Sequence, residues 1–171
     1  MTHRELVERA RRWLEAIGCG VVLCEVAVTN EIPDAIGYTR NGSRTYLLEC
    51  KASRNDFHSD KNKPHRNGTI EGLGNFRYYV CEPNVITIDD LPPRWGLIYV
   101  YEKQVRVMHG YNPRIRMSWQ HWHHKSHDKN ERALLYSACR RIQELVGHDP
   151  TFQLIHRKLS PLHNTEFIAP D

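Results

Sequence analysis

The sequence lacks the features of several protein classes, and each absence narrows what the chain can be. No apolar run approaches the ~20 residues of a membrane-spanning helix, so we expect no membrane partner. The N-terminal segment MTHRELVERARRWLEAIG is charged and has no apolar centre, so we expect no secretion signal. The five cysteines form no CxxC pair and are odd in number. We therefore expect free cysteines in a reduced, cytoplasmic protein.

What the sequence does contain suits one domain. The 171 residues are 40% hydrophobic, which is enough for a core, and they hold no repeats or low-complexity segments. The net charge is +4, and 11 histidines add positive charge in mildly acidic conditions. This balance permits a polyanionic partner but does not require one.

Hydrophobic periodicity predicts alternating helices and strands. A helix over 2–17 opens on a capping box of Thr2 and Glu5. The dipeptide Asn41–Gly42 predicts a hairpin turn between two strands. The expected strands are 21–28, 34–39, 44–51, 76–82, 96–101 and 104–108, and the further helices are 54–62 and 128–146.

These elements predict an α/β fold around one mixed sheet. A helix, three antiparallel strands, a second helix and a fourth strand come first, and a C-terminal helical extension follows. We place the core at residues 1–110. Residues 111–171 then hold a His- and Arg-rich insertion, the last helix and a tail, all packed on the same domain.

An acid and a base stand where the third strand should stay apolar. Side chains alternate along a strand, so Glu49 and Lys51 share one face at the end of this strand. Asp34 starts the neighbouring strand and, counted out from the hairpin turn, comes close to opposite Glu49. Burying such charges costs on the order of several kcal/mol unless partners hold them. The alternative interpretation is a surface salt bridge between Glu49 and Lys51, which contributes little.

Two neighbouring carboxylates predict a cation between them, because they would otherwise repel each other. Mg²⁺ accepts Asp34, Glu49, waters and a backbone carbonyl, here that of Cys50, and Mn²⁺ can substitute. Such an ion activates a water and stabilises charge on a phosphate oxygen. Lys51 would position the water or stabilise the developing charge. The set suits hydrolysis of a phosphodiester.

The arrangement resembles the PD-(D/E)XK nuclease superfamily. The stretch PDAIG, at 33–37, is followed by the hairpin and by LLECK, at 47–51. Within that superfamily the runs ECKASRNDFHSDKNK, FRYYVCEP and LPPRWGLIYV look most like the MmcB-type group of bacterial DNA-repair proteins. The opening RELVERARRWLEAIG is similar to archaeal-type Holliday-junction resolvases, which share the core.

The resemblance covers roughly residues 2–101 and implies a restriction-endonuclease-like core with Asp34, Glu49 and Lys51 as the catalytic set. It implies a metal-dependent DNA endonuclease acting in repair, recombination or DNA processing, and it allows a homodimer. Such nucleases often carry a further acid. Glu25 matches the MmcB-type pattern and Glu5 the resolvase pattern, and we favour Glu25. The alternative function is a non-catalytic nucleic-acid-binding module that keeps this fold.

A basic segment after the catalytic strand is a candidate for nucleic-acid contacts. Arg54, Lys61, Lys63 and Arg66 would face phosphates in the functional interpretation. In the other interpretation they belong to a solvated helix with Asp–Lys pairs and an ordinary surface loop.

A second candidate segment, 119–127, holds four histidines and two tryptophans. Three interpretations stay open: a zinc site, a nucleic-acid surface, or a polar insertion without a ligand. Because no cysteine accompanies the histidines, we favour a phosphate-binding loop, with Arg114, Arg116 and Lys125, over zinc.

Overall fold

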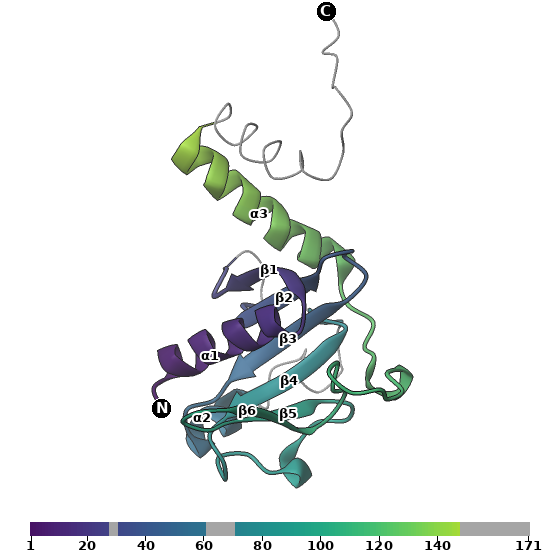
Figure 1. Cartoon of the computed structure of the whole chain (residues 1–171). Coiled ribbons are helices and arrows are strands. Elements are labelled where there is room, and N and C mark those ends of the chain that lie inside the picture. Colours follow the sequence, from purple (N-terminus) through teal and green to yellow (C-terminus); the bar gives the residue numbers. More distant parts are fainter. Residues whose placement is uncertain (28–30, 61–70, 148–171) are drawn as a thin grey trace, which may run out of the picture. The chain divides into compact units, whose positions relative to one another are not determined.

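The computed structural model describes residues 1–27, 31–60 and 71–147 of the chain (Figure 1). Its helices and strands follow the predicted order. They are α1 (His3–Ala16), β1 (Cys19–Cys24), β2 (Ala35–Thr39), β3 (Thr45–Cys50), α2 (Arg54–Asp60), β4 (Phe76–Cys81), β5 (Gly96–Val100), β6 (Val105–His109) and α3 (Asp128–Val146). Two short 3-10 helices, η1 (Ile88–Asp90) and η2 (Gln120–Trp122), lie in the connections.

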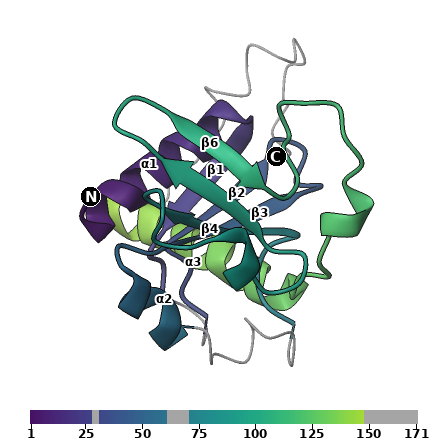
Figure 2. The same ribbon diagram turned by 90° about the horizontal axis from the view of Figure 1, so that it is seen from below.

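One mixed sheet carries the six strands in sequence order, from β1 to β6 (Figure 1). Figure 2 views the same strands from below. The pairs β1–β2, β2–β3 and β5–β6 are antiparallel, whereas β3–β4 and β4–β5 are parallel. The predicted α/β class and mixed sheet are thus confirmed. The C-terminal ends of the parallel strands β3, β4 and β5 point to the same end of the sheet. The start of β2, which runs antiparallel to β3, lies beside the end of β3.

The first strand begins and ends earlier than the sequence predicts. The prediction spans 21–28, whereas β1 covers Cys19–Cys24. The next residue, Glu25, has a φ of 52°, outside the extended region, and its N–H contacts the carbonyls of Pro33 and Asp34. This turn ends the strand. The last predicted position, Val28, lies outside the described residues.

Two local signals form the structures they predict. Thr2 and Glu5 make the capping box of α1, in which each side chain accepts from the backbone N–H of the other residue. Between β2 and β3, Gly42 adopts a φ of 66° and donates its N–H to the carbonyl of Thr39. These contacts form the hairpin that sets the register of β2 against β3.

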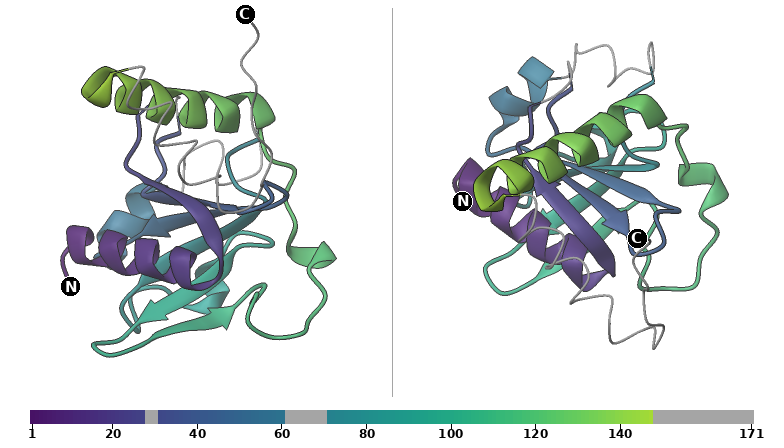
Figure 3. Two further views of the ribbon diagram at one scale, coloured as in Figure 1. Left: turned by 45° about the horizontal axis from the view of Figure 1, so that its top comes forward. Right: turned by 90° about the horizontal axis from the view of Figure 1, so that it is seen from above.

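Helix α1 covers one face of the sheet and crosses β1 to β4 (Figure 3). Its buried side chains pack with Tyr46 and Leu48 of β3 in one apolar core. The helix approaches closely because Gly37 of β2 has no side chain. A Cβ at that position would lie 2.7 Å from Cys19 Sγ and 2.9 Å from Leu14 Cδ2.

The opposite face of the sheet holds a second buried layer. Phe57 of α2 meets Tyr79 of β4 edge-on, with ring centroids 5.0 Å apart, and Tyr79 stacks on Trp95 at 4.7 Å. Glu49 pairs with Tyr79 in the β3–β4 register, so its side chain points into this layer. The predicted alternation of β3 is therefore confirmed, and Glu49 lies away from α1.

The chain divides into two compact units, Met1–Leu134 and Leu135–Asp171. The sheet, α1, α2 and the first turns of α3 belong to the first unit. There Glu131 joins α3 to the sheet, because its Oε1 accepts from Thr45 Oγ1 at 3.0 Å and from the N–H of Gly74 at 2.8 Å. The expected division at residue 110 stays a prediction.

The five cysteines are all free, as predicted. Within the described residues, no helix combines the length and the apolar character needed to cross a membrane.

Candidate active site

The end of β3 carries a buried acid–base pair. Lys51 follows the strand directly, and its N–H donates to the carbonyl of Val80 at 2.9 Å. Its Nζ lies 3.9 Å from Glu49 Oε2. Glu49 is 2% exposed and Lys51 is 5% exposed. The alternative interpretation as a surface salt bridge is therefore wrong, because both charges are removed from solvent.

Asp60, the last residue of α2, is a second acid beside Lys51. Its Oδ2 lies 3.5 Å from Lys51 Nζ, and the residue is 2% exposed. Phe57 lies three positions earlier on the same face of α2 and anchors the helix on Tyr79. The pairing of Asp60 with Lys51 was not predicted. The available signal was the spacing of an apolar and an acidic residue in DFHSD, which places both on one helix face.

Asp34 reaches the same strand end from β2. The register pairs Ala35 with Leu48, so one step further out Asp34 stands opposite Glu49, as the count from the hairpin predicts. Asp34 Oδ2 accepts the N–H of Cys50 at 2.7 Å. The carboxylate is therefore fixed to the backbone between Glu49 and Lys51.

His3 on the first turn of α1 joins two further acids at this edge. Its Nε2 lies 3.5 Å from Asp34 Oδ1 and 3.6 Å from Glu25 Oε1. Glu25 is therefore near Asp34, although its side chain is 62% exposed. His3 was not among the predicted site residues, because no spacing in the sequence links it to residues so far along the chain.

Glu5, the alternative further acid, has a different position. It is bound to Thr2 in the capping box, and the hydrogen bond from the Thr2 backbone holds the pKa of Glu5 below its usual value. Together with Glu8, Arg9 and Glu82 it lines a hollow of about 570 Å³ along α1 that does not include Asp34. The contacts thus place Glu25, and not Glu5, beside Asp34.

The oxygen donors at this strand end fit a hard divalent cation. Asp34 and Glu49 supply carboxylates, and a cation would offset the cost of burying them. Cys50 can offer such an ion its backbone carbonyl but not its thiol, because burial raises the pKa of the thiol well above the usual value. The described residues contain no group of three or more His, Cys, Asp or Glu side chains that could hold a metal ion. A site here would consist of two carboxylates, a carbonyl and water.

The predicted phosphate-binding residues have mixed outcomes. The guanidinium of Arg54 forms a bidentate pair with Asp90, with N–O distances of 2.5 and 2.6 Å, and this pair connects α2 to η1. Part of the donor set of Arg54 is thus engaged within the fold, and its predicted phosphate contact stays a prediction. Lys61, Lys63 and Arg66 lie outside the described residues, so their role stays a prediction.

The His-rich segment packs its rings on one another and on the core. Trp119 and Trp122 are partly buried and pack against the apolar core, and His109 and His121 each meet Trp122 edge-on at 4.9 Å. His124 is buried, and its Nε2 lies 3.1 Å from the carbonyl of Arg94. In the described part of the chain, these histidines form no metal-binding group. Their contacts are those of a structural anchor.

Comparisons with known proteins show a shared fold. No protein-family model matches the chain, and no curated protein matches its sequence significantly. A solved structure, that of the SPO1766 protein of unknown function from Silicibacter pomeroyi, is similar with a TM-score of 0.58. The two sequences are 20% identical, and the match covers 85% of this chain and 92% of that chain. At this identity the likeness bears on the fold alone.

Proposed function

We propose that the chain is a Mg²⁺-dependent DNA endonuclease of the PD-(D/E)XK superfamily, acting in DNA repair, recombination or processing. The observation that carries the proposal is the cluster at the end of β3. There Asp34 is bonded to the backbone between Glu49 and Lys51, whose side chains are buried together. The order α1–β1–β2–β3–α2–β4 is also that of a restriction-endonuclease-like core and supports the assignment.

Each residue of the cluster has a role in this proposal. Asp34 and Glu49 hold Mg²⁺ together with the Cys50 carbonyl, and Mn²⁺ can replace it. The bound ion supplies an activated water and stabilises charge on the phosphate. Lys51 orients the water or stabilises the developing negative charge. Asp60 keeps the Lys51 ammonium in place, and Glu25 is the further acid.

Burial argues against the alternative of a non-catalytic nucleic-acid-binding module. Phosphate contacts are made by exposed cations, whereas Lys51 is buried between two acids. Holding such charges out of solvent is costly for the folded state, and a binding surface has no need of them. A cytoplasmic location and a homodimer belong to the same proposal.

The test combines cleavage and metal binding. The full chain is incubated with labelled duplex, branched and single-stranded DNA and with RNA, in Mg²⁺, Mn²⁺ or chelator. We expect metal-dependent cleavage of DNA by the wild type. We expect no cleavage by Asp34→Asn or Lys51→Ala, because the first loses a metal ligand and the second loses the group beside the water. Titration calorimetry should show heat of Mg²⁺ or Mn²⁺ binding that Asp34→Asn lacks.

Two matched acid variants compare the two candidates for the further acid in the same assay, with Glu5→Gln as the control. Glu25→Gln should lower cleavage, because the Glu25 and Asp34 carboxylates both lie beside the His3 ring. Glu5→Gln should cleave like the wild type, because glutamine still completes the capping box. Wild-type rates in Asp34→Asn or Lys51→Ala would refute this site. Absence of both cleavage and metal heat would point to the non-catalytic module.

A further inference from the structure

We propose that the loop 110–118, which follows β6, is a second contact with duplex DNA. In this contact Arg114 and Arg116 bind phosphates and Ile115 inserts between bases in the minor groove. Apolar side chains flanked by arginine are used in this way by proteins that bend DNA. The inference rests on the proposed function for the identity of the polymer, and it adds a binding site away from the catalytic cluster.

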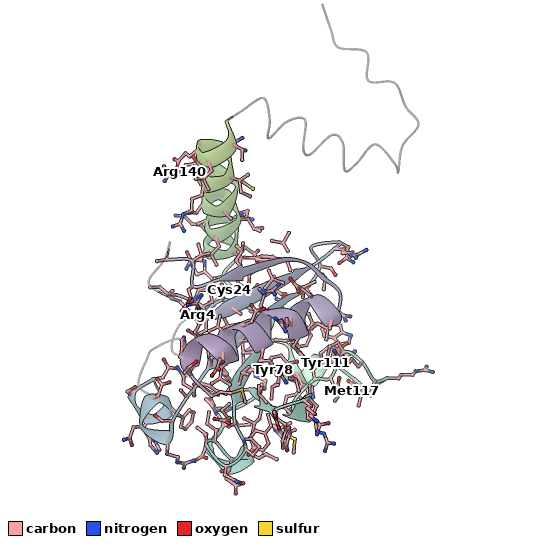
Figure 4. All side chains as sticks on the ribbon, turned by 60° about the vertical axis from the view of Figure 1, so that its left-hand side comes forward. Arg4, Cys24, Tyr78, Tyr111, Met117 and Arg140 are labelled. Atoms are coloured by element: carbon pink, nitrogen blue, oxygen red, sulfur yellow. The ribbon has the colours of Figure 1, made fainter. Side chains whose placement is uncertain are left out.

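The two ends of the loop are held firmly on the first unit. Gly110 has a φ of 98°, and a Cβ there would lie 2.7 Å from the Cα of Gly96, so the chain turns tightly against β5. Tyr111 stacks on Phe76 at 4.7 Å, and its carbonyl accepts from Tyr78 Oη at 2.5 Å. Figure 4 shows Tyr78, Tyr111 and Met117 near one another. The loop is therefore presented on a rigid base.

The tip of the loop is shaped by Asn112. Its side-chain oxygen accepts the N–H of Arg114 at 3.0 Å, and its carbonyl accepts the N–H of Ile115 at 3.3 Å. Its own N–H donates to Met117 Sδ at 3.1 Å. These bonds close the loop on itself and turn its tip outward. Ile115 is 59% exposed, so the tip of the loop offers an apolar side chain to a partner.

The charge around the tip suits a polyanion. Between Lys103 and His127 the sequence contains no Asp or Glu. Other cations near this loop are engaged: Arg44 lies over the Trp119 ring, and Lys125 pairs with Glu71 at 2.6 Å.

Arg114 and Arg116 differ from these engaged cations. Both are exposed, and their guanidinium groups make no hydrogen bond or ion pair with any described residue. Exposed, unpaired arginines on a rigid loop are suited to phosphate contacts.

The position of the loop sets a distance to the candidate active site. Tyr111 packs on Phe76, which pairs with Tyr46 at the start of β3, whereas Glu49 lies three residues further along the same strand. At ~3.3 Å per residue, about 10 Å of strand separates Tyr46 from Glu49, so the base of the loop packs at the opposite end of β3 from the candidate site.

The experiment measures binding of the full chain carrying Asp34→Asn, which should not cut, to a 30-base-pair duplex with 2-aminopurine placed at successive positions. We expect Arg114→Gln/Arg116→Gln to weaken binding about tenfold or more and to reduce the slope of log K against log salt by about 2. We expect Ile115→Ala to keep that slope but to lose the fluorescence increase that reports unstacking. The matched control, Arg140→Gln/Arg141→Gln, removes two exposed arginines elsewhere and should change neither quantity.

Several outcomes would overturn the inference. These are an unchanged salt slope in the loop double variant, an equal loss in the control, or full fluorescence in Ile115→Ala. Preference for vesicles containing phosphatidylserine over duplex would assign the loop to a membrane surface instead. Cleavage by the wild type without any effect of the loop variants would refute this inference and leave the proposed function standing. Duplex binding that depends on the loop, without cleavage by the wild type, would support this inference and refute the proposed function.

Discussion

At the scale of single residues, the most informative contact is the one between Asp60 and Lys51. A lysine buried beside two carboxylates keeps one orientation only if both acids remain. Glu49 has a second task in the proposed metal site, whereas Asp60 comes from another element, α2, and its carboxylate lies beside Lys51 Nζ. Asp60 is therefore a positioning residue in this proposal.

Asp60→Asn should lower kcat about ten- to a hundredfold, in the range seen for groups that orient active-site residues. KM should change little, because DNA binding does not involve this buried side chain. Steady-state cleavage kinetics measure the two constants. Asp60→Glu should recover part of the rate by restoring the charge.

The control for this variant lies on the same helix. Asp56 accepts the N–H of Ala52 and is not in contact with Lys51, so Asp56→Asn should retain the wild-type kcat. A wild-type kcat in Asp60→Asn would show that Lys51 needs no second partner.

At the scale of elements, α1 docks on the sheet through one small residue. Gly37 lies beneath the helix, where an added Cβ would collide with Cys19 Sγ and Leu14 Cδ2. Both are core atoms on opposite sides of the contact, so neither can move freely. The position of α1 matters for the candidate site, because its first turn carries His3.

Gly37→Ala should lower the free energy of unfolding by about 1–3 kcal/mol, the usual cost of overpacking a core. Urea unfolding followed by circular dichroism measures the change. Gly20→Ala is the matched control on β1: its Cβ would meet mainly the side chain of Arg40, which can move aside. Equal costs in the two variants would show that strand propensity, and not the α1 contact, is responsible.

At the scale of the whole molecule, stability should depend on pH through His124. Burial, and then the charge of Arg77, lower the pKa of His124 from 6.5 to about 4. Between these two values the histidine of the unfolded chain is protonated while that of the folded chain is neutral. The unfolded state then binds more protons, so stability falls as the pH falls through this range.

From pH 7 to pH 5, this one residue should remove about 2 kcal/mol from the free energy of unfolding. Urea unfolding at the two pH values measures the loss. His124→Asn should show a smaller loss between the same pH values, whatever its stability at pH 7. An unchanged pH dependence in His124→Asn would mean that His124 is protonated in the folded chain.

Much of the fold could be predicted because its signals are local. The capping box of Thr2 and Glu5, the turn at Asn41–Gly42 and the alternation along 44–51 depend on residues within a few positions of one another. The hairpin turn fixes the register of the two strands, so the position of Asp34 opposite Glu49 could be predicted by counting residues out from the turn. The exception was the first strand, because the turn at Glu25 depends on carbonyls of Pro33 and Asp34 beyond the next connection.

The remaining contacts depend on how elements separated by long connections meet. His3 reaches Asp34 only because α1 lies on the sheet at a given angle, and Asp60 reaches Lys51 only because Phe57 seats α2 on Tyr79. All three arginines are exposed, but Arg54 is paired with Asp90, whereas Arg114 and Arg116 form no ion pair with a described residue. The sequence alone determined which residues form strands and helices and which acids share the hairpin. Only the tertiary structure decided which charges are paired, because pairing is a matter of distance between elements and no local pattern encodes that distance.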